Sequence, residues 1–481
     1  MRISSEVEPF NLAQYFVDRH VAEGRGSQIA IVYEGRRYSY SEIAALVNQA
    51  ANGLRRAGVQ PGDRVLIVLP DSPEFVAAYF GAMKIGAVAV PTSTALRPAD
   101  YAVLAEESQA RIVVSAPVWQ AEPPAPLDCA PTAPDDPAFW LWTSGSTGPP
   151  KAAVHRHCDW LACCEGYARG VLGIHPHDVT FSSAKLFHAY GLGNGLMFPF
   201  YVGATTVLYP GKPLANAILA CAHGCRPTLF FAVPTHYAAM LHETDSANPY
   251  DLSCVRLGIS AAEPLPAEIV RRWRARFGFD VLDGIGSTEV LHIYISNRPG
   301  SLRPGSSGVP VPGYEVRIAD ENGRDLPAGE TGDLWVRGPS NATHYWNRPQ
   351  FTAQRMREGW FFSGDKYRVD AGGYYWYAGR SDDMFRVSGE WVSPIEVEGA
   401  LIAHPAVLEA AVVARLGEDG LPAACAFVTL KQPAAAGEEL AGDLRRFVRA
   451  RLAGYKRPRR IEFLDELPKT ATGKVQRYKL R

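Results

Sequence analysis

The chain has 481 residues, too many for one ordinary hydrophobic core, so we expect two or more domains. Apolar residues make up 47% and charged residues 21%, which is typical of a globular enzyme, and the net charge of −1 indicates no nucleic-acid or anionic-membrane partner. No apolar run reaches the roughly 18 residues that span a bilayer, and Glu6 and Glu8 interrupt the N-terminus, so we expect no membrane anchor and no secretory signal.

The first part of the chain alternates helical and extended patterns. Apolar residues at helical spacing predict a helix from Ser41 to Gly58, with Ser41 as its N-cap, and a second helix over residues 73–86. Short apolar runs at residues 64–69 and 87–91 predict strands. Alternation of this kind is typical of parallel α/β layers.

A loop rich in Ser, Thr and Gly follows the next predicted strand. Residues 116–137 are rich in Pro and Ala and predict a surface connection, after which residues 138–142 predict a strand. Residues 142–151 then read WTSGSTGPPK. Backbone N–H groups of such a loop can form a concavity that binds anions, and hydroxyl groups add donors, which suits a polyphosphate. The loop lacks the Gly-Lys-Ser/Thr ending of a Walker A motif, and by composition alone it could equally be a flexible linker.

Eight cysteines are scattered along the chain without paired spacing, which predicts reduced thiols and a cytoplasmic location. Residues 155–158 and 221–225 each combine His and Cys, but neither cluster has a second pair at zinc-site spacing. We therefore interpret these cysteines as small buried apolar residues.

The pattern changes in the C-terminal third. Short alternating runs over residues 313–379, divided by Gly and Asn turns, predict a small antiparallel sheet or barrel. A compact α+β segment is expected after Asp382.

Four further motifs follow the Ser/Thr/Gly loop in order: DGIGSTE at 283–289, FSGD at 362–365, GRSDD at 379–383 and PKTATGK at 468–474. With the loop, they resemble the motifs of the adenylate-forming acyl-CoA synthetase superfamily, and the resemblance runs from about Tyr33 to the end. Residues 185–194 and 284–300 are more specifically similar to the benzoate–CoA ligase branch.

The resemblance implies an α/β fold in two parts. Residues 1–381 would form a large N-terminal AMP-binding domain of layered α/β subdomains with a small antiparallel β-barrel. Residues 382–481 would form a small mobile α+β C-terminal domain, with Asp382 as the hinge. The implied chemistry has two steps: a carboxylate attacks the α-phosphate of ATP to give an acyl-adenylate, and a thiol then expels AMP.

The resemblance also implies the nucleotide-binding residues. The β- and γ-phosphates would be held by Thr143, Ser144, Gly145, Ser146, Thr147, Gly148 and Lys151. The adenosine would lie against Ala262, Glu263, Pro264, Asp283, Gly284, Ile285, Asp365 and Arg380, with Asp365 on the ribose hydroxyls and Asp283 on the adenine amino group. Many relatives have Gly at the position of Ala262 and an aromatic ring at that of Ile285.

Four residues carry catalytic expectations from the same resemblance. Thr288 would donate to the α-phosphate, Glu289 would bind Mg²⁺, and Lys474 would contact the reacting carboxylate and the α-phosphate. His188 would gate the carboxylate. Taken alone, Thr288 and Glu289 could be an ordinary helix start, with Thr288 as N-cap.

The acid pocket is expected from two segments. Its candidate residues are His188, Ala189, Tyr190, Gly284, Gly286, Leu291 and His292. Small Gly residues opposite aromatic rings predict a flat slot for an aryl ring, and His188, Tyr190 and His292 offer polar contacts to a ring substituent. No acidic residue lies within residues 185–194, which disfavours an α-amino acid, because its buried ammonium group would have no counter-charge from this segment.

Three functions are compatible with these motifs. The first is ATP-dependent activation of a benzoate-type acid, with Mg²⁺, followed by transfer to CoA. The second loads the acid onto the phosphopantetheine arm of a carrier protein acting in trans, because no carrier domain follows Lys474. The third is a non-catalytic nucleotide-binding regulator, which Asp365, Glu289 and Lys474 argue against. The sequence leaves open a monomer or a homodimer.

Overall fold

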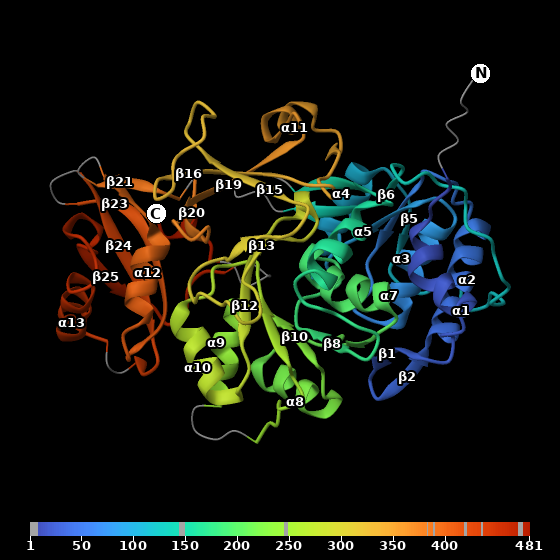
Figure 1. Cartoon of the computed structure of the whole chain (residues 1–481), viewed down its shortest axis with the longest axis horizontal. Coiled ribbons are helices and arrows are strands. Elements are labelled where there is room, and N and C mark those ends of the chain that lie inside the picture. Colours follow the sequence, from blue (N-terminus) through green and yellow to red (C-terminus); the bar gives the residue numbers. More distant parts are fainter. Residues whose placement is uncertain are drawn as a thin grey trace.

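The computed structural model describes residues 8–143, 150–244, 249–381, 383–387, 390–417, 421–433, 436–469 and 475–481. In Figure 1 the chain up to residue 310 forms two α/β layers, an antiparallel sheet lies above them, and the C-terminal residues form a separate body at one end. No helix in these ranges is long and apolar enough to cross a membrane. All eight cysteines fall within the described ranges, and each is a free thiol.

The first layer is a six-stranded sheet in the order β17-β7-β6-β4-β3-β5. The strands β3, β4, β5 and β6 run parallel, as expected, whereas β6 and β7 are antiparallel and flank the Ser/Thr/Gly loop. Their bounds are β3 Arg64–Ile67, β4 Val88–Pro91, β5 Ala110–Val114, β6 Pro137–Thr143, β7 Lys151–Arg156 and β17 His344–Tyr345.

Two helices lie at the positions that the sequence predicted and pack against each other, and the second also packs on β3 and β4 of this sheet. These are α2, Tyr40–Arg56, and α3, Pro73–Lys84. The expectation that Ser41 caps the first helix is wrong. Ser39 is the N-cap: its backbone is extended, its Oγ accepts from the Glu42 N–H at 3.2 Å, and Glu42 accepts from the Ser39 N–H at 2.7 Å. This reciprocal capping box explains why the helix begins two residues earlier.

The second layer is a nine-stranded sheet in the order β14-β13-β12-β11-β10-β8-β9-β1-β2. Its central strands are parallel, and antiparallel pairs close both ends. Its strands are β1 Ile29–Tyr33, β2 Arg36–Ser39, β8 Val179–Ser182, β9 Thr205–Leu208, β10 Leu229–Ala232, β11 Leu257–Ser260, β12 Val281–Gly286, β13 Ile293–Ser296 and β14 Val309–Pro310. The helices α8 Ala215–Cys225, α9 Pro234–Glu243 and α10 Ala267–Phe277 share a second hydrophobic cluster with it.

Shorter helices connect these layers. They are α1 Arg19–Ala22, α4 Pro98–Ser108, α5 Asp159–Cys163, α6 Ala189–Leu192, α7 Phe198–Val202 and α11 Pro349–Arg355.

The antiparallel sheet expected within residues 313–379 is present. Its five strands are β15 Glu315–Ala319, β16 Thr331–Arg337, β18 Met356–Arg357, β19 Trp360–Val369 and β20 Tyr375–Arg380. They pair in the order β15-β16-β19-β18, with β20 also on β19, so the sheet is a partial barrel with open edges.

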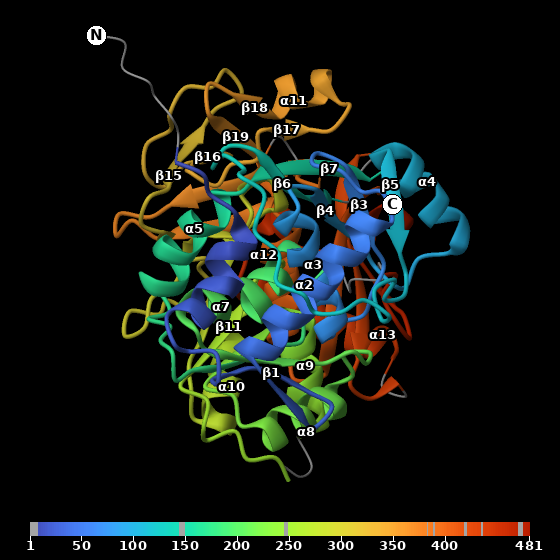
Figure 2. The same cartoon turned by 90° about the vertical axis from the view of Figure 1, so that its right-hand side faces the viewer.

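The C-terminal body has its own sheets and its own apolar clusters, which contain only residues from 385 onward. Figures 1 and 2 show it, in orange and red, beside the α9–α10 side of the molecule. Its elements are β21 Phe385–Val387, β22 Glu390–Val392, α12 Pro394–Ile402, β23 Val407–Leu416, β24 Pro422–Leu430, α13 Glu438–Arg449 and β25 Arg460–Phe463.

Several contacts hold the chain on both sides of residues 470–474. Lys469 and Val475 form an antiparallel bridge, and the Gln476 N–H donates to the Pro468 carbonyl at 2.7 Å. Beyond them, Arg477 makes a paired ionic contact with buried Glu398 on α12, at 2.8–2.9 Å for its Nη2 atom.

Candidate active site

The candidate site lies where four parallel strands end together. Strands β8, β10, β11 and β12 are successive parallel neighbours, so their carboxyl ends meet at one edge of the nine-stranded sheet. Ligands of open α/β sheets bind in the crevice outside such an edge. The structure therefore brings together the three sequence-predicted segments that follow these strands, which are residues 185–194, 261–264 and 287–292.

The segment after β8 turns into a helix at the predicted pocket. Ala189 is buried at the start of α6, and half-exposed His188 is its N-cap residue, with its ring centroid 4.2 Å from that of Phe187. A π-helical turn, Gly193–Met197, continues α6, a geometry frequent at functional sites. Because His188 is half-exposed, it is not a histidine packed in the core.

The hydroxyl group of Tyr190 bonds to the backbone of the sheet and has no hydrogen left for a ligand. Its hydroxyl donates to the Ile259 carbonyl at 3.0 Å, with the Ala232 carbonyl at 3.3 Å. Both carbonyls belong to β10 and β11. The expected polar contact from Tyr190 to a ring substituent is thus limited to the lone pairs of its oxygen, because its only hydrogen is engaged.

His292 is buried in a cage of aromatic rings. Its ring lies 4.5 Å from Phe198, 5.5 Å from Tyr167 and 5.7 Å from Tyr190, measured between centroids. Burial lowers its pKa to about 3, so the ring is neutral at physiological pH. Its Nδ1 atom has no hydrogen-bond partner among the described residues, and neither polar atom of fully buried Asn194 has one. Buried polar atoms are normally paired, so these two side chains can serve a ligand.

The glycines of the pocket have a different role from the one that the sequence suggested. A Cβ atom on Gly284 would lie 2.8 Å from the Ile295 carbonyl oxygen, and one on Gly286 would lie 2.7 Å from the His292 carbonyl oxygen. The missing side chains therefore allow the backbone of β13 to approach β12. They do not open the flat slot that we expected on that side.

The segments expected to flank the adenosine lie beside the end of β12. Ala262 has a left-handed backbone, with φ of +77°, which is the conformation that favours Gly and explains the Gly of many relatives. Glu263 accepts from the Thr235 hydroxyl at 3.0 Å, Pro264 follows it, and Ile285 is half-buried on β12.

Asp283 is a buried carboxylate with one open oxygen. Its Oδ2 accepts from the Leu265 N–H at 3.3 Å, and its Oδ1 has no partner among the described residues. Burial raises the pKa of this carboxyl group well above its usual range. An open acceptor at the edge of the site fits an amino group of a bound base.

We expect Asp283→Asn to raise the KM for ATP about tenfold, which corresponds to roughly 1.4 kcal/mol for one lost hydrogen bond. The amide can keep the contact with Leu265, but it then turns an N–H group toward the base. Because burial raises the Asp283 pKa above that of the unfolded chain, this carboxyl group lowers the stability of the fold as pH rises above the unfolded-state pKa. The neutral amide has no such cost and should not lower the melting temperature at pH 7. An unchanged KM for ATP would contradict the assignment.

The Thr288–Glu289 motif forms one 3₁₀ turn, Thr288–Val290, rather than the start of a long helix. Its N-cap is Ser287, whose side chain makes no capping bond, so the interpretation of Thr288 as a helix cap is wrong. Thr288 is half-buried, and Glu289 is buried, with its Oε1 accepting from the Tyr345 hydroxyl at 2.7 Å.

Lys151 faces the same turn from the other layer. It opens β7 and pairs with Thr143, the last residue of β6. Its Nζ lies 4.4 Å from the ring centroid of Phe351, and burial lowers its pKa, with the charge of Arg355 acting in the same direction and that of Glu289 opposing. The residues predicted between these ends, Ser144, Gly145, Ser146, Thr147 and Gly148, lie outside the described residues, as do Asp382 and Lys474.

Asp365 and Arg380 face each other on neighbouring strands. They are register partners on β19 and β20, and the Arg380 guanidinium donates to Asp365 Oδ1 at 3.0 Å. Burial raises the pKa of Tyr294, and the charges of Asp365 and Glu289 raise it further.

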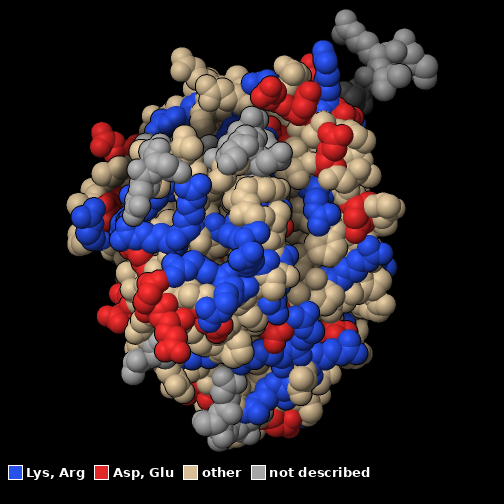
Figure 3. Space-filling model, turned by 90° about the vertical axis from the view of Figure 1, so that its left-hand side faces the viewer, with Lys and Arg blue, Asp and Glu red and all other residues tan. Residues whose placement is uncertain are grey.

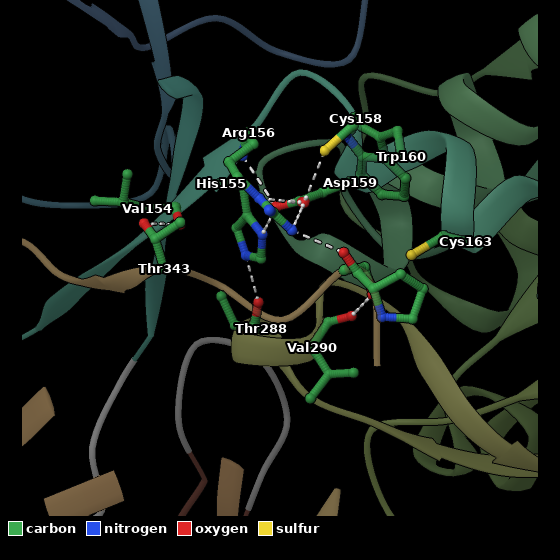
Figure 4. A network of polar contacts seen from close by, with 12 residues as sticks. Val154, His155, Arg156, Cys158, Asp159, Trp160, Cys163, Thr288, Val290 and Thr343 are labelled. Carbon is green, nitrogen blue, oxygen red and sulfur yellow. Dashed lines mark hydrogen bonds and ion pairs between the residues drawn. The ribbon is translucent and has the colours of Figure 1, made fainter. Parts of the chain in front are cut away.

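Three polar residues of the site were not found from the sequence. Tyr345 donates to Glu289, and Ser340 donates to the Val290 carbonyl. His155 contacts the Thr288 carbonyl, as Figure 4 shows. A fourth, Asp71, lies beside the pocket segment 185–194 in space, although it is distant from that segment in sequence. It accepts from the Leu186 N–H at 3.0 Å and lies 3.7 Å from the Lys185 ammonium, so its charge is already compensated.

The Glu289 carboxylate is suited to bind a magnesium ion whose other ligands are substrate phosphates and water. No group of three or more His, Cys, Asp or Glu side chains that could hold a metal occurs in the part of the chain that the structure describes. Mg²⁺ is commonly held by one or two carboxylates with substrate phosphates and water, so one carboxylate beside a phosphate site fits it.

A second cavity lies on the C-terminal body. It has a volume of about 330 Å³, and its lining includes Val387, Tyr455, Arg457 and Arg459. The Arg457 Nε atom is buried without a partner among the described residues. Figure 3 shows Lys and Arg side chains gathered across this end of the molecule. A cavity with an aromatic ring and two guanidinium groups suits a phosphorylated nucleotide.

Comparison with known proteins agrees with this geometry. Residues 18–127 and 116–346 match the family model described as AMP-binding enzyme, and residues 396–474 match the AMP-binding enzyme C-terminal domain. The chain is 47% identical to a benzoate–CoA ligase of Thauera aromatica, over 98% of this chain and 96% of that protein.

Solved structures are similar over the same length. A benzoate CoA ligase from Burkholderia xenovorans LB400 has 44% identity and a TM-score of 0.90, over 98% of this chain and 100% of that chain. An anthranilate CoA ligase in complex with anthranoyl-AMP has 38% identity and a TM-score of 0.94, over 100% of this chain and 98% of that chain.

Proposed function

The chain belongs to the AMP-binding enzyme family, and from this premise we propose how its site carries out the reaction of an AMP-forming aryl acid–CoA ligase. The acid's carboxylate attacks the α-phosphate of ATP, which gives an acyl-adenylate and pyrophosphate. The thiol of CoA then attacks the acyl carbon and AMP leaves. Such chemistry depends on positioning and charge neutralisation, not on a covalent enzyme intermediate.

One observation supports the site assignment most directly. The pocket segment after β8, the segment after β11 and the Thr288–Glu289 turn after β12 converge at one sheet edge. We assign the acid to the first, the adenosine to the second and the α-phosphate to the third.

Individual roles follow from the contacts. Thr288 is half-exposed and can donate to the α-phosphate, while Asp283 offers its open oxygen to the adenine amino group. Asp365 accepts from the ribose hydroxyls, beside Arg380. Lys474 keeps the role that the family resemblance implies, contact with the carboxylate and the α-phosphate, and Asp382 keeps the role of hinge between residues 1–381 and 382–481.

Mg²⁺ is part of the proposal at Glu289. Tyr345 fixes one carboxylate oxygen, which leaves the other directed to a ligand. When bound there, the ion would neutralise phosphate charge. Around it, Lys151 supplies a further positive charge for pyrophosphate.

CoA is the proposed occupant of the cavity on the C-terminal body. Val387, which lines this cavity, belongs to β21, the partner of β22. Arg457 and Arg459 can neutralise phosphates, and the Tyr455 ring can stack on an adenine. The cavity would therefore hold the nucleotide end of CoA.

We propose that the acid is benzoate or a benzoate with one small polar ring substituent. The ring cage around His292 suits an aryl group, and the unpaired atoms of His292 and Asn194 could meet a hydroxyl or amino substituent.

The test is a panel of acids read by pyrophosphate release: benzoate, hydroxy- and aminobenzoates, cinnamate, hexanoate and phenylalanine. We expect a benzoate to exceed hexanoate and phenylalanine in kcat/KM by at least tenfold, or roughly 1.4 kcal/mol, because flexible acids must be ordered on binding. A preference for hexanoate or phenylalanine would refute the pocket assignment.

The acceptor is tested with the same panel. Thioester formation is compared between CoA and a phosphopantetheine-bearing carrier protein; preference for the carrier would support the alternative of loading in trans. Absence of pyrophosphate release with every acid would favour the nucleotide-binding regulator.

A further inference from the structure

The 3₁₀ turn that carries Thr288 and Glu289 is held by donors from outside itself. All three of its carbonyl oxygens accept such a bond: Thr288 from His155 Nε2 at 2.8 Å, Glu289 from the Ala342 N–H at 2.7 Å, and Val290 from the Ser340 hydroxyl at 2.7 Å. A turn of this length cannot fix its own position through internal bonds, so these contacts locate it.

The turn also ends in a strained residue. Leu291 follows it with φ of +73°, in a region where a bulky side chain is a clear outlier and costs about 1–3 kcal/mol. Such a backbone persists only where the surroundings over-determine it. The strain indicates that the turn's geometry is imposed by its external contacts.

His155 differs from the other two donors because it is a side chain from the strand that follows the phosphate loop. It lies on β7, a few residues after Lys151, and is fully buried. Its Nε2 must carry a hydrogen, since the Thr288 carbonyl oxygen can only accept. It therefore joins β7, the strand that Lys151 opens, to the Thr288 turn, and Figure 4 shows this contact.

The orientation of the His155 ring is fixed on two further sides. Its Nδ1 lies 3.1 Å from Asp159 Oδ2, and its face stacks on Phe139 with centroids 5.2 Å apart and planes 12° apart. Asp159 is itself fully buried and accepts from the backbone N–H and the Nε of Arg156, at 2.9 and 3.0 Å. The chain Arg156–Asp159–His155–Thr288 is thus continuous and rigid.

We propose that His155, oriented by Asp159, is a positioning residue for adenylate formation. It sets the place of the Thr288–Glu289 turn relative to the phosphate loop without touching substrate. This inference rests on the proposed function, because the roles of Thr288 and Glu289 belong to that proposal. Residues that orient ligands of a reacting centre typically contribute 10- to 100-fold to activity, and we expect an effect of that size.

Two substitutions distinguish the contact made by His155 Nε2 from the contact made by its Nδ1. The glutamine amide reaches about as far as Nε2 and can still donate to the Thr288 carbonyl, whereas the asparagine amide reaches about as far as Nδ1 and serves only Asp159. We expect His155→Asn to lower kcat for benzoate-dependent pyrophosphate release roughly 10- to 100-fold with the KM for benzoate unchanged. His155→Gln should recover most of this loss.

His157 supplies a matched control. It is also fully buried, two residues further on, and its Nδ1 accepts from the Leu12 N–H at 3.2 Å, away from the turn. His157→Asn should reduce the melting temperature at least as much as His155→Asn but leave kcat near that of the parent enzyme. Equal kcat losses in His155→Asn and His155→Gln, a loss of the same size in His157→Asn, or no loss in His155→Asn would each overturn the inference.

Thr288→Ala and Glu289→Gln, measured in parallel, distinguish this inference from the proposed function. If both lower pyrophosphate release and His155→Asn does not, only the positioning role fails. If neither lowers it, the assignment of the turn fails, whatever the His155 variants do.

Discussion

Lys474→Ala is expected to lose adenylate formation, with a fall in the rate of benzoate-dependent pyrophosphate release of roughly 100- to 1,000-fold. The reason is electrostatic: a cation that contacts both the reacting carboxylate and the α-phosphate brings two anions together and neutralises the charge that builds up between them. Transfer of the acyl group from supplied benzoyl-adenylate to CoA should be reduced far less, because the first step is then already complete. The two half-reactions are measured separately, by pyrophosphate release and by thioester formation.

Lys469 is the matched control for that experiment. It is a lysine of the same segment, but its ammonium group contacts Glu409 Oε1 at 2.5 Å. Lys469→Ala should leave both half-reactions close to those of the parent enzyme. If Lys474→Ala slowed the two half-reactions equally, its assignment to the first step alone would be wrong.

The second large effect is expected at Glu289. Glu289→Gln keeps the size of the side chain but removes the negative charge, so we expect pyrophosphate release to fall roughly 100-fold or more at a fixed Mg²⁺ concentration, with partial recovery as Mg²⁺ is raised. Because residue 289 is buried, few other groups can replace its carboxylate as a ligand of Mg²⁺. The measurement is the rate of pyrophosphate release against Mg²⁺ concentration, with binding of AMP as a readout of a folded site.

Tyr345→Phe completes this comparison. It removes the hydroxyl that donates to Glu289 Oε1 but leaves the carboxylate, so a smaller loss, roughly tenfold, is expected. If Glu289→Gln retained the parent rate and Mg²⁺ dependence, the metal would have to be held elsewhere. If Tyr345→Phe lost more than Glu289→Gln, Tyr345 itself would be the more important group.

The sequence predicted the fold well wherever local patterns decide the structure. The helices α2 and α3, the strands β3, β4 and β6 and the irregular connection over residues 116–136 all follow from periodicity and composition, whereas β5 was not predicted. The error at the start of α2 has a local cause, because Ser39 and Ser41 are both acceptable caps and only the reciprocal contact with Glu42 distinguishes them. The antiparallel pairing of β6 with β7 could not be inferred, since strand direction depends on partners distant in sequence.

The candidate site was predictable only where its residues belong to motifs. Thr288, Glu289, Asp283 and Asp365 were identified in that way; Asp283 lies on β12, Thr288 and Glu289 follow it, and Asp365 lies on β19. His155 and Tyr345 were missed because their roles depend on contacts across 133 and 56 residues of sequence. The glycines at 284 and 286 were found, but the approach of β13 that explains them is a tertiary contact.

The contacts on both sides of residues 470–474 decide when the conformational entropy of closing this connection is lost. The Lys469–Val475 bridge brings the two ends of the segment together, and Arg477 fastens the following residues to Glu398 on α12. The entropy of closing this connection is therefore lost once, when the C-terminal body folds. In the proposed movement about Asp382, Lys469 and Val475 move together with that body, so successive turnovers do not repeat this entropic penalty.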